Sequence, residues 1–337
     1  MVVDPWDNWG MGSITNFESK RCQKKRTWLQ RVLPRSISVE LAGGLGNQLF
    51  LLVAGIYISK QLKVPLKVFV NDILSSSTVN GMGLSSFRFF SEGSSLIHSV
   101  KYRPSRMLRF RKILNSGLLR FRISKRVSDS ISGYYSPLLV GDDPNIGLIK
   151  AGTFVEGYFQ SAKYFLDVRD SEGFLGFELQ RPSLWFREML MEIKMAKPIS
   201  VHIRRGDYLN PENDFIGALS KTYFLEAIKL LRKNSGFKDS EVWIFSNDIP
   251  HVKNEFGTDV EGVVRWVEPP KLSSEAESLL LMANSRGLVI SNSTFSWWSA
   301  AIGQPEKVIS PSKWFKSADD PEELIFPYWE KVDSSWL

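Results

Sequence analysis

The residues most able to do chemistry lie close together in one short segment, from His202 to Tyr208. This segment places Arg204, Arg205 and Asp207 directly after the apolar stretch that starts at Ile199, so we expect them at the end of a buried strand. A guanidinium group offers its donors in a planar fork that matches the oxygens of a phosphate. The pattern therefore predicts a site for a strongly anionic ligand, and a diphosphate is the first candidate.

Asp207 is open to two interpretations. Its carboxylate can pair with Arg204 or Arg205 and hold that guanidinium in a fixed orientation, which favours binding of an anion. It can also act as a general base. The sequence leaves both roles open, with structural bracing favoured.

A glycine turn at residues 43–46 precedes a second candidate site. We expect Asn47 to cap a helix there, and backbone N–H groups at such a position bind anions. Gly44 and Gly46, with Asp72 after the next strand, form an incomplete dinucleotide fingerprint, because Leu49 occupies the place of the third glycine. An NAD(P)-dependent oxidoreductase is therefore kept as an alternative.

Two further polar junctions follow predicted strands. Ser246 and Asp248 come after an apolar strand, where the carboxylate could accept from a guanine base or a ribose, or could simply cap a helix that begins at Pro250. The segment 291–298 reads Ser-Asn-Ser-Thr-Phe-Ser-Trp-Trp, and its hydroxyl groups suit a diphosphate. We expect its two tryptophans in the core rather than against a ligand.

Alternating strands and helices must position these junctions. A strand at 37–41, a helix at 48–61 and a strand at 66–70 form a βαβ start, which predicts a parallel sheet. The second half continues with strands at 199–203, 242–245, 263–267, 288–290 and 308–309, separated by helical segments. This order predicts an α/β protein whose loops gather at the strand ends.

Composition limits the classes of function. The formal net charge of the 337 residues is +7, which indicates anionic partners, and a single cysteine with three scattered histidines makes a zinc site improbable. Residues 101–126 contain ten Lys or Arg and no acidic residue; they form either a solvated helix face or a surface that docks on an anionic membrane. Aromatic residues do not alternate with these cations as a stacking platform requires, so no nucleic acid is expected.

The motifs together resemble those of glycosyltransferase family 11, the α-1,2-fucosyltransferases that use GDP-fucose. The resemblance covers roughly residues 37–316 and rests mainly on the HxRRxDY pattern at 202–208 and on the NSTFSWW run at 292–298. Weaker matches are found at 43–50, 157–165, 245–248, 281–282 and 311–315.

The resemblance implies an α/β fold of the GT-B type, with two facing Rossmann-like domains and the active site in the cleft between them. On this basis we expect a basic, loosely ordered tail at 1–35, an acceptor-side domain at 36–195 and a GDP-fucose-binding domain at 196–337. It also implies an inverting transfer of fucose from GDP-fucose to the 2-hydroxyl of a terminal galactose, in an oligosaccharide or a lipid-linked glycan. No metal or other cofactor is expected, because fixed arginine charge can replace the divalent ion and no Asp-x-Asp pair was found.

Residue roles follow from this resemblance. Arg204 is expected to stabilise charge on the departing diphosphate, and His202, Asp207 and Glu156 are candidates for the general base. The residues expected to contact the donor substrate GDP-fucose are Gly44, Gly46, Asn47, Arg204, Arg205, Ser246, Asp248, Ser293, Thr294 and Ser296. Glu156, Tyr158 and Gln160 are expected on the acceptor side. With neither a signal peptide nor a membrane span recognised, we expect a cytoplasmic enzyme in peripheral contact with the inner face of the plasma membrane.

Overall fold

A computed structural model describes residues 36–70, 83–89, 97–101, 105–137, 140–170, 176–271, 273–321 and 323–337. Asp72, the ribose-binding residue of the oxidoreductase alternative, and the predicted tail lie outside these residues. Residues Arg35–Leu337 cluster as one unit, which contains both sheets described below.

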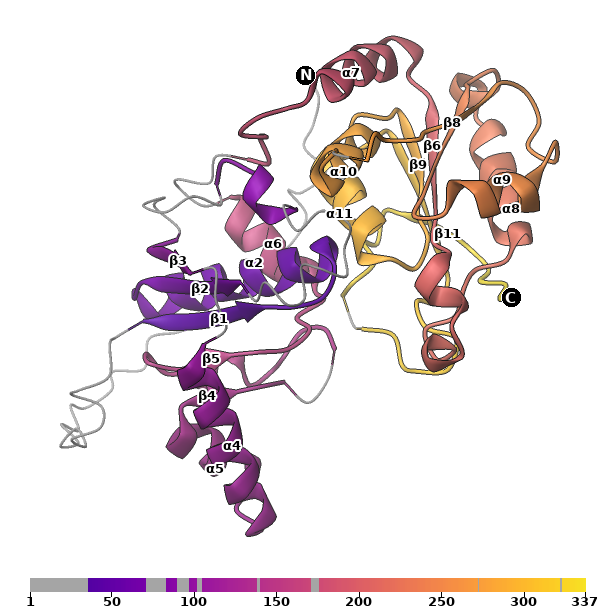
Figure 1. Cartoon of the computed structure of the whole chain (residues 1–337). Coiled ribbons are helices and arrows are strands. Elements are labelled where there is room, and N and C mark those ends of the chain that lie inside the picture. Colours follow the sequence, from indigo (N-terminus) through magenta and orange to yellow (C-terminus); the bar gives the residue numbers. More distant parts are fainter. Residues whose placement is uncertain are drawn as a thin grey trace, which may run out of the picture. The chain divides into compact units, whose positions relative to one another are not determined.

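The first half forms a parallel sheet of five strands in the order β3-β2-β1-β5-β4 (Figure 1). Its strands are β1 (Ile37–Leu41), β2 (Leu66–Val70), β3 (Ser99–Lys101), β4 (Tyr134–Tyr135) and β5 (Phe154–Val155). Its helices are α2 (Leu45–Leu62), α4 (Arg106–Arg120), α5 (Lys125–Ser132) and α6 (Ala162–Arg169), with short 3-10 turns η1 (Leu84–Ser86) and η2 (Ile146–Leu148). Helix α2 is apolar on nearly all sides, which is why it is buried against the sheet and α6.

The second half forms a parallel sheet of six strands in the order β11-β10-β9-β6-β7-β8. Its strands are β6 (Ile199–Ile203), β7 (Val242–Ser246), β8 (Val264–Trp266), β9 (Gly287–Val289), β10 (Lys307–Pro311) and β11 (Glu330–Val332). Its helices are α7 (Leu184–Ala196), α8 (Lys221–Arg232), α9 (Ile249–Phe256), α10 (Glu275–Ala283) and α11 (Thr294–Gly303), with 3-10 turns η3 (Gly206–Leu209), η4 (Pro211–Asn213) and η5 (Ser235–Phe237). Counted from β6, the strand order is 3-2-1-4-5-6, that of the Rossmann fold.

Both sheets reverse their strand order beside the first strand, at the pairs β1–β5 and β6–β9. Ligands of open α/β sheets bind outside the carboxyl ends of the strands at such a switch point. The α/β class with two parallel sheets is confirmed. The domain boundary at residues 195/196 falls in the last turn of α7, just before β6, and stays a prediction.

Buried aromatic rings connect α11 to α2. Trp297 and Trp298 are fully buried and contact Phe50 of α2, with ring centroids 4.6 and 4.9 Å away. The indole N–H of Trp298 donates to the carbonyl of Gly46 over 2.9 Å, and that of Trp297 donates to Leu324 O over 2.7 Å. The expectation that both tryptophans belong to the core is confirmed.

Two local predictions were wrong. The cap of α2 is Gly44, whose carbonyl accepts the first helical hydrogen bond from Gln48, so Asn47 lies inside the first turn. Strand β11 was not expected. The basic run covers α4 and the first two residues of α5, and both of its interpretations stay predictions. Within the described residues, no helix is long and apolar enough to cross a membrane.

Candidate functional site

Arg204 follows β6 directly and lies at the switch point of the second sheet. Its side chain is 29% exposed, and its Nη2 is 2.8 Å from Asp207 Oδ1. Its guanidinium carbon lies 5.4 Å from the centre of the Tyr208 ring. Its Nε is buried without a hydrogen-bond partner among the described residues. Asp207 and Tyr208 thus orient Arg204 from two sides, and its guanidinium keeps N–H groups for a ligand. The expected ion pair between Asp207 and Arg204 is confirmed.

Arg205 points elsewhere. Its side chain is fully buried, and its Nε and Nη2 each lie 2.8 Å from one carboxylate oxygen of Glu255 on α9. Its remaining donor, Nη1, bonds to the carbonyl of Arg204 over 2.9 Å. The expectation that this side chain contacts the sugar-nucleotide donor is corrected, because the guanidinium is fully buried and each of its three nitrogens bonds to a protein oxygen. It supports the loop that carries Arg204.

His202 is buried within β6. Its Nδ1 lies 2.9 Å from the hydroxyl of Ser291, and its ring lies beside Phe295. Burial, followed by the nearby Arg204 charge, lowers the pKa of His202 from 6.5 to about 3. A base this weak is poorly suited to accept a proton from a sugar hydroxyl, so His202 fits a positioning role better than that of general base.

This shift predicts how stability depends on pH. Between pH 6.5 and 3 the unfolded chain protonates this histidine and the folded chain does not, so acidification favours unfolding by on the order of 1.4 kcal/mol per pH unit. Urea unfolding of the wild type and of His202→Asn between pH 6.5 and 3 measures how much His202 contributes to the pH dependence of the unfolding free energy. The variant is expected to show a shallower slope, whereas His98→Asn, an exposed position, serves as the matched control. Equal slopes for the wild type and His202→Asn would contradict the buried neutral histidine.

Segment 291–298 supports the site from β9. The Asn292 amide donates to the carbonyls of Ile216, Gly217 and Trp314 over 3.1, 2.9 and 3.1 Å, which anchors this segment. The Tyr208 hydroxyl donates to Asn292 O over 3.1 Å, and burial raises the pKa of Tyr208 to about 12. The loop of β6 and the loop of β9 are therefore fastened to each other.

The three predicted hydroxyls have different environments. Ser293 caps α11 by accepting from Phe295 N. The Thr294 hydroxyl donates to Asn47 Oδ1 over 3.1 Å. Ser296 is fully buried, and its hydroxyl contacts the carbonyls of Ser291 and Ser293, so its predicted role as a donor contact is corrected.

The first sheet contributes Asn47 and Gln160. The Gln160 amide donates to Asn47 Oδ1 over 3.2 Å, so Asn47 joins residues from β5's loop and from α11. The Oε1 of Gln160 is buried without a partner among the described residues. A Cβ on Gly46 would lie 2.5 Å from Thr294 Oγ1 and 2.6 Å from its backbone carbonyl carbon. The glycine is needed for the close packing of α2 and α11, and its predicted contact with the nucleotide stays a prediction. Gly44, at the cap, has open space around it.

The remaining predicted residues are held locally. Asp248 caps α9 by accepting from His251 N over 3.1 Å, and Ser246 accepts from Asp248 N, so the capping interpretation is confirmed. Glu156 accepts from Lys112 Nζ at 2.8 and 2.9 Å and from the hydroxyl of Tyr134 at 2.8 Å. Tyr158 is exposed.

Two acidic residues were missed. Glu255 balances Arg205, and Glu275 begins α10. Burial raises the pKa of Glu275, and the charge of Arg204 opposes that rise, so this carboxylate lies within the electrostatic reach of the arginine. Ser274 caps α10 by accepting from Ala276 N, and Glu277 in the first turn of this helix accepts from Ser183.

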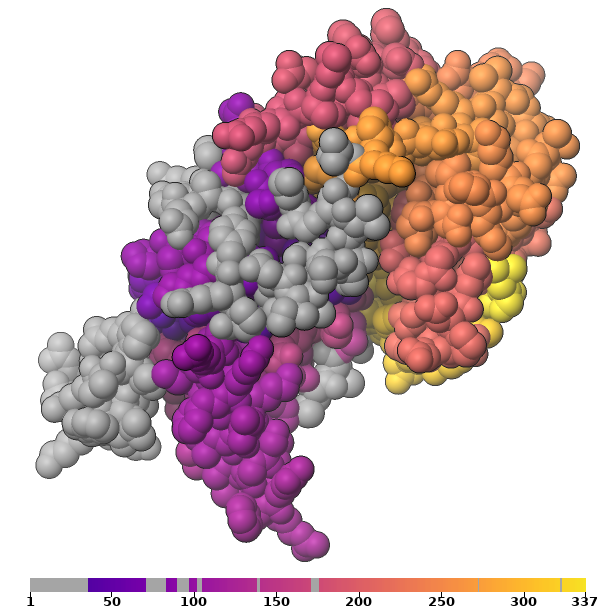
Figure 2. Space-filling model, viewed as in Figure 1, coloured from indigo at the N-terminus to yellow at the C-terminus, as the bar shows by residue number. Residues whose placement is uncertain are grey.

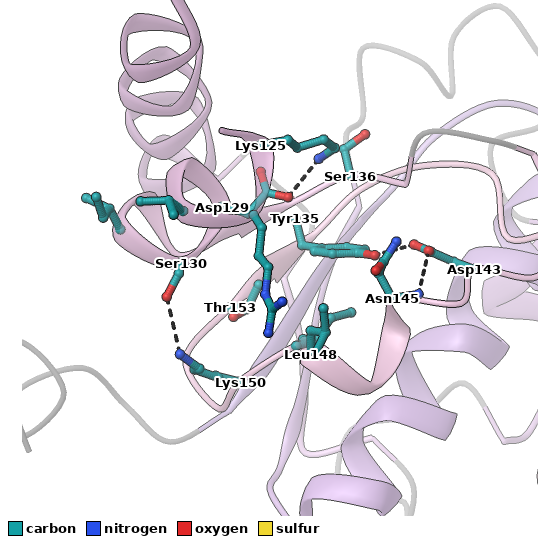
Figure 3. A pocket seen from close by; sticks show the side chains of 14 residues that line it. Lys125, Asp129, Ser130, Tyr135, Ser136, Asp143, Asn145, Leu148, Lys150 and Thr153 are labelled. Carbon is teal, nitrogen blue, oxygen red and sulfur yellow. Dashed lines mark hydrogen bonds and ion pairs between the residues drawn. The ribbon is translucent and has the colours of Figure 1, made fainter. Parts of the chain in front are cut away.

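A cavity of about 550 Å³ lies elsewhere, between α5 and the segment 143–153 (Figure 3). It is lined by side chains that include Lys125, Tyr135 and Lys150, and by none of the predicted site residues. Among the described residues, no cluster of three His, Cys, Asp or Glu side chains could hold a metal ion.

The model of glycosyl transferase family 11 matches residues 36–323. The chain belongs to this family. The resemblance inferred from the motifs is confirmed, and family membership leaves no support for the oxidoreductase alternative.

Two curated relatives, both from Escherichia coli, are similar over most of their length. An alpha-1,2-colitosyltransferase is 27% identical over 83% of this chain and 92% of its own. The O-antigen biosynthesis glycosyltransferase WbnK is 28% identical over 86% of this chain and 98% of its own. Among solved structures, the fucosyltransferase NodZ from Bradyrhizobium aligns with a TM-score of 0.46 at 12% identity, over 82% of this chain and 95% of NodZ.

Proposed function

We propose that this family 11 glycosyltransferase transfers L-fucose from GDP-fucose to the 2-hydroxyl of a terminal galactose, with inversion and without a metal ion. The observation that carries the proposal is Arg204, partly exposed at the switch point and held by Asp207 and Tyr208 with donors left over. Negative charge grows on the diphosphate as the bond to fucose breaks. A guanidinium fixed in place stabilises that charge with little reorganisation.

The neighbouring residues suggest how the donor is held. The N-terminus of α11, capped by Ser293, follows β9 beside the loop of Arg204, and a helix N-terminus favours an anion. We place the diphosphate against Arg204 and this helix start, with Gly44 and the Asn47–Gln160 pair contributing from the first sheet.

The acceptor hydroxyl must lose a proton. Asp207 is already paired with Arg204, and Glu156 is held by Lys112 and Tyr134, so neither carboxylate is free. We add Glu275 to the candidates, because a raised pKa makes a carboxylate a stronger base.

The acceptor is proposed to be a galactose-terminated glycan, free or lipid-linked. The test is a transfer assay with GDP-fucose over a panel of galactosides, with the new linkage determined by NMR. We expect an α-1,2 product and activity that persists in excess EDTA. Full loss in EDTA that Mg²⁺ or Mn²⁺ restores would contradict the metal-free mechanism.

Similarity to the relative named as a colitosyltransferase supports a second candidate for the donor substrate, one that carries colitose. The same panel is therefore run with a colitose donor. Exclusive use of colitose would replace fucose in the proposal, and a product bonded at another galactose position would contradict the α-1,2 linkage.

A further inference from the structure

Helices α4 and α5 form a hairpin that exposes many of its apolar side chains. In Figures 1 and 2 the hairpin extends away from the first sheet, with its base against β4. Phe121, between the helices, is 82% exposed, and Ile113 and Phe110 of α4 are 72% and 62% exposed. The further exposed apolar residues of α4 are Met107, Leu114 and Leu119, whereas the exposed Val127 and Ile131 of α5 line the cavity described above. Several large exposed apolar side chains on one helix are typical of an interaction site.

The inner face of the same hairpin is mainly polar, although Leu108 of α4 is buried there with Phe69, Tyr134 and Phe154. Asn115 of α4 donates to Asp129 Oδ1 over 2.8 Å and to Ser132 Oγ over 3.1 Å, and Ser128 Oγ donates to Asn115 O over 3.1 Å. Arg111 is also buried and donates to the carbonyl of Gly133 over 2.8 Å. A helix on the surface of a water-soluble domain usually turns its apolar side inward. Here folding leaves most of the apolar side chains of α4 exposed, so they are available to a partner.

The charge of the hairpin indicates which kind of partner would bind to its exposed apolar side chains. Arg106, Arg109, Arg120, Arg122 and Arg126 are all exposed, and no ion pair with them is found among the described residues. Apolar and aromatic side chains beside unpaired cations are typical of a helix that lies in the interface of an anionic membrane.

We propose that the α4–α5 hairpin docks the enzyme on an anionic phospholipid bilayer. Phe110, Ile113 and Phe121 enter the boundary between head groups and acyl chains, and the exposed arginines contact lipid phosphates. Lys112 on α4 binds Glu156 at the end of β5, which connects the hairpin to the switch point of the first sheet. Docking through this hairpin brings the acceptor side of the enzyme to a membrane-bound glycan.

The first test is cosedimentation of the full chain with vesicles of phosphatidylcholine alone or with phosphatidylglycerol. Binding to the anionic vesicles is expected. Replacing Arg120, Arg122 and Arg126 by Gln is expected to weaken it about a hundredfold, since each cation near an anionic surface contributes roughly a factor of five. Phe110→Ser with Phe121→Ser is expected to weaken it at least about tenfold, because apolar burial is lost.

Matched controls lie in the second half. Leu184→Ser with Met195→Ser removes comparably exposed apolar side chains from α7. Gln at Lys194, Lys233 and Lys238 removes three exposed charges. Both control variants are expected to bind as the wild type does. Equal losses in the control and hairpin variants would place the contact elsewhere and overturn the proposal.

A second test reports insertion directly. An environment-sensitive dye on Phe121→Cys, in a Cys22→Ser background, is expected to shift to the blue with anionic vesicles, and the same dye on Met195→Cys is not. Absence of wild-type binding, or a dimer in solution that the hairpin variants dissociate, would overturn the proposal. Neither assay uses a donor or acceptor, so its failure is distinct from failure of the proposed transfer reaction.

Discussion

Replacing Arg204 by lysine is expected to lower kcat by about 10²–10³-fold, the usual effect of removing one preorganised donor from a developing oxyanion. The variant keeps the positive charge but loses the planar fork, and an ammonium cannot contact Asp207 and two diphosphate oxygens in the same geometry. The side chain is partly exposed and belongs to no core cluster, so the fold is expected to persist.

The measurement is steady-state kinetics with GDP-fucose, together with a urea midpoint for each variant. Arg181→Lys, at an exposed arginine of the second half, is the matched control and is expected to leave kcat unchanged. Wild-type turnover in Arg204→Lys would remove this residue from the proposed mechanism.

Asp207→Asn separates the two roles considered for that carboxylate. If Asp207 braces Arg204, the asparagine variant loses less activity than Arg204→Lys and keeps the shape of the wild-type pH profile. If Asp207 is the base, kcat falls by about 10²–10⁴-fold and the limb of the pH profile that belongs to the base disappears. The Asp207–Arg204 ion pair favours the first result.

Replacing Glu255 by alanine is expected to destabilise the fold by about 3–5 kcal/mol, because it leaves the charge of Arg205 buried without a partner. Arg205 is fully buried, and two of its nitrogens bond to Glu255, which is itself mostly buried. The double variant Arg205→Met with Glu255→Leu removes both charges and is expected to recover much of the lost stability.

Urea unfolding measures this effect, and Glu306→Ala is the matched control. Glu306 pairs with Arg286 on the surface, so its removal is expected to cost less than about 1 kcal/mol. Activity per folded molecule in the double variant tests the corrected role of Arg205. Because the variant also loses the hydrogen bond to the Arg204 carbonyl, a modest rise in its KM for GDP-fucose is expected, and a rise as large as that of a variant without the Arg204 guanidinium would return Arg205 to the donor site.

The order of the polar junctions could be read from the sequence. Each junction follows a short apolar strand. Because the periodicity of strands and helices depends only on residues near one another in the chain, the strands at 199–203 and 242–245 and the cap at Asp248 could be predicted. The motifs at 202–208 and 292–298 also predicted the family correctly.

The partners of individual side chains could not be read in this way. Arg204 and Arg205 are neighbours with the same chemistry, yet one is partly exposed and the other is paired with Glu255, 50 residues away. Gly46 matches a nucleotide-binding turn locally, but Thr294 packs against it. The exposure of a guanidinium and the space beside a glycine depend on residues far apart in the chain.

By itself, the sequence of this protein determined the α/β class, the family and the strand ends at which the candidate site lies, because local periodicity and motif spacing carry that information. Only the tertiary structure decided that Arg204 is partly exposed while Arg205 is buried, that His202 is buried and neutral, and that the α4–α5 hairpin exposes many apolar side chains. The physical reason is that burial and pairing are set by which elements pack together, and they in turn control charge, pKa and the surface left for a partner.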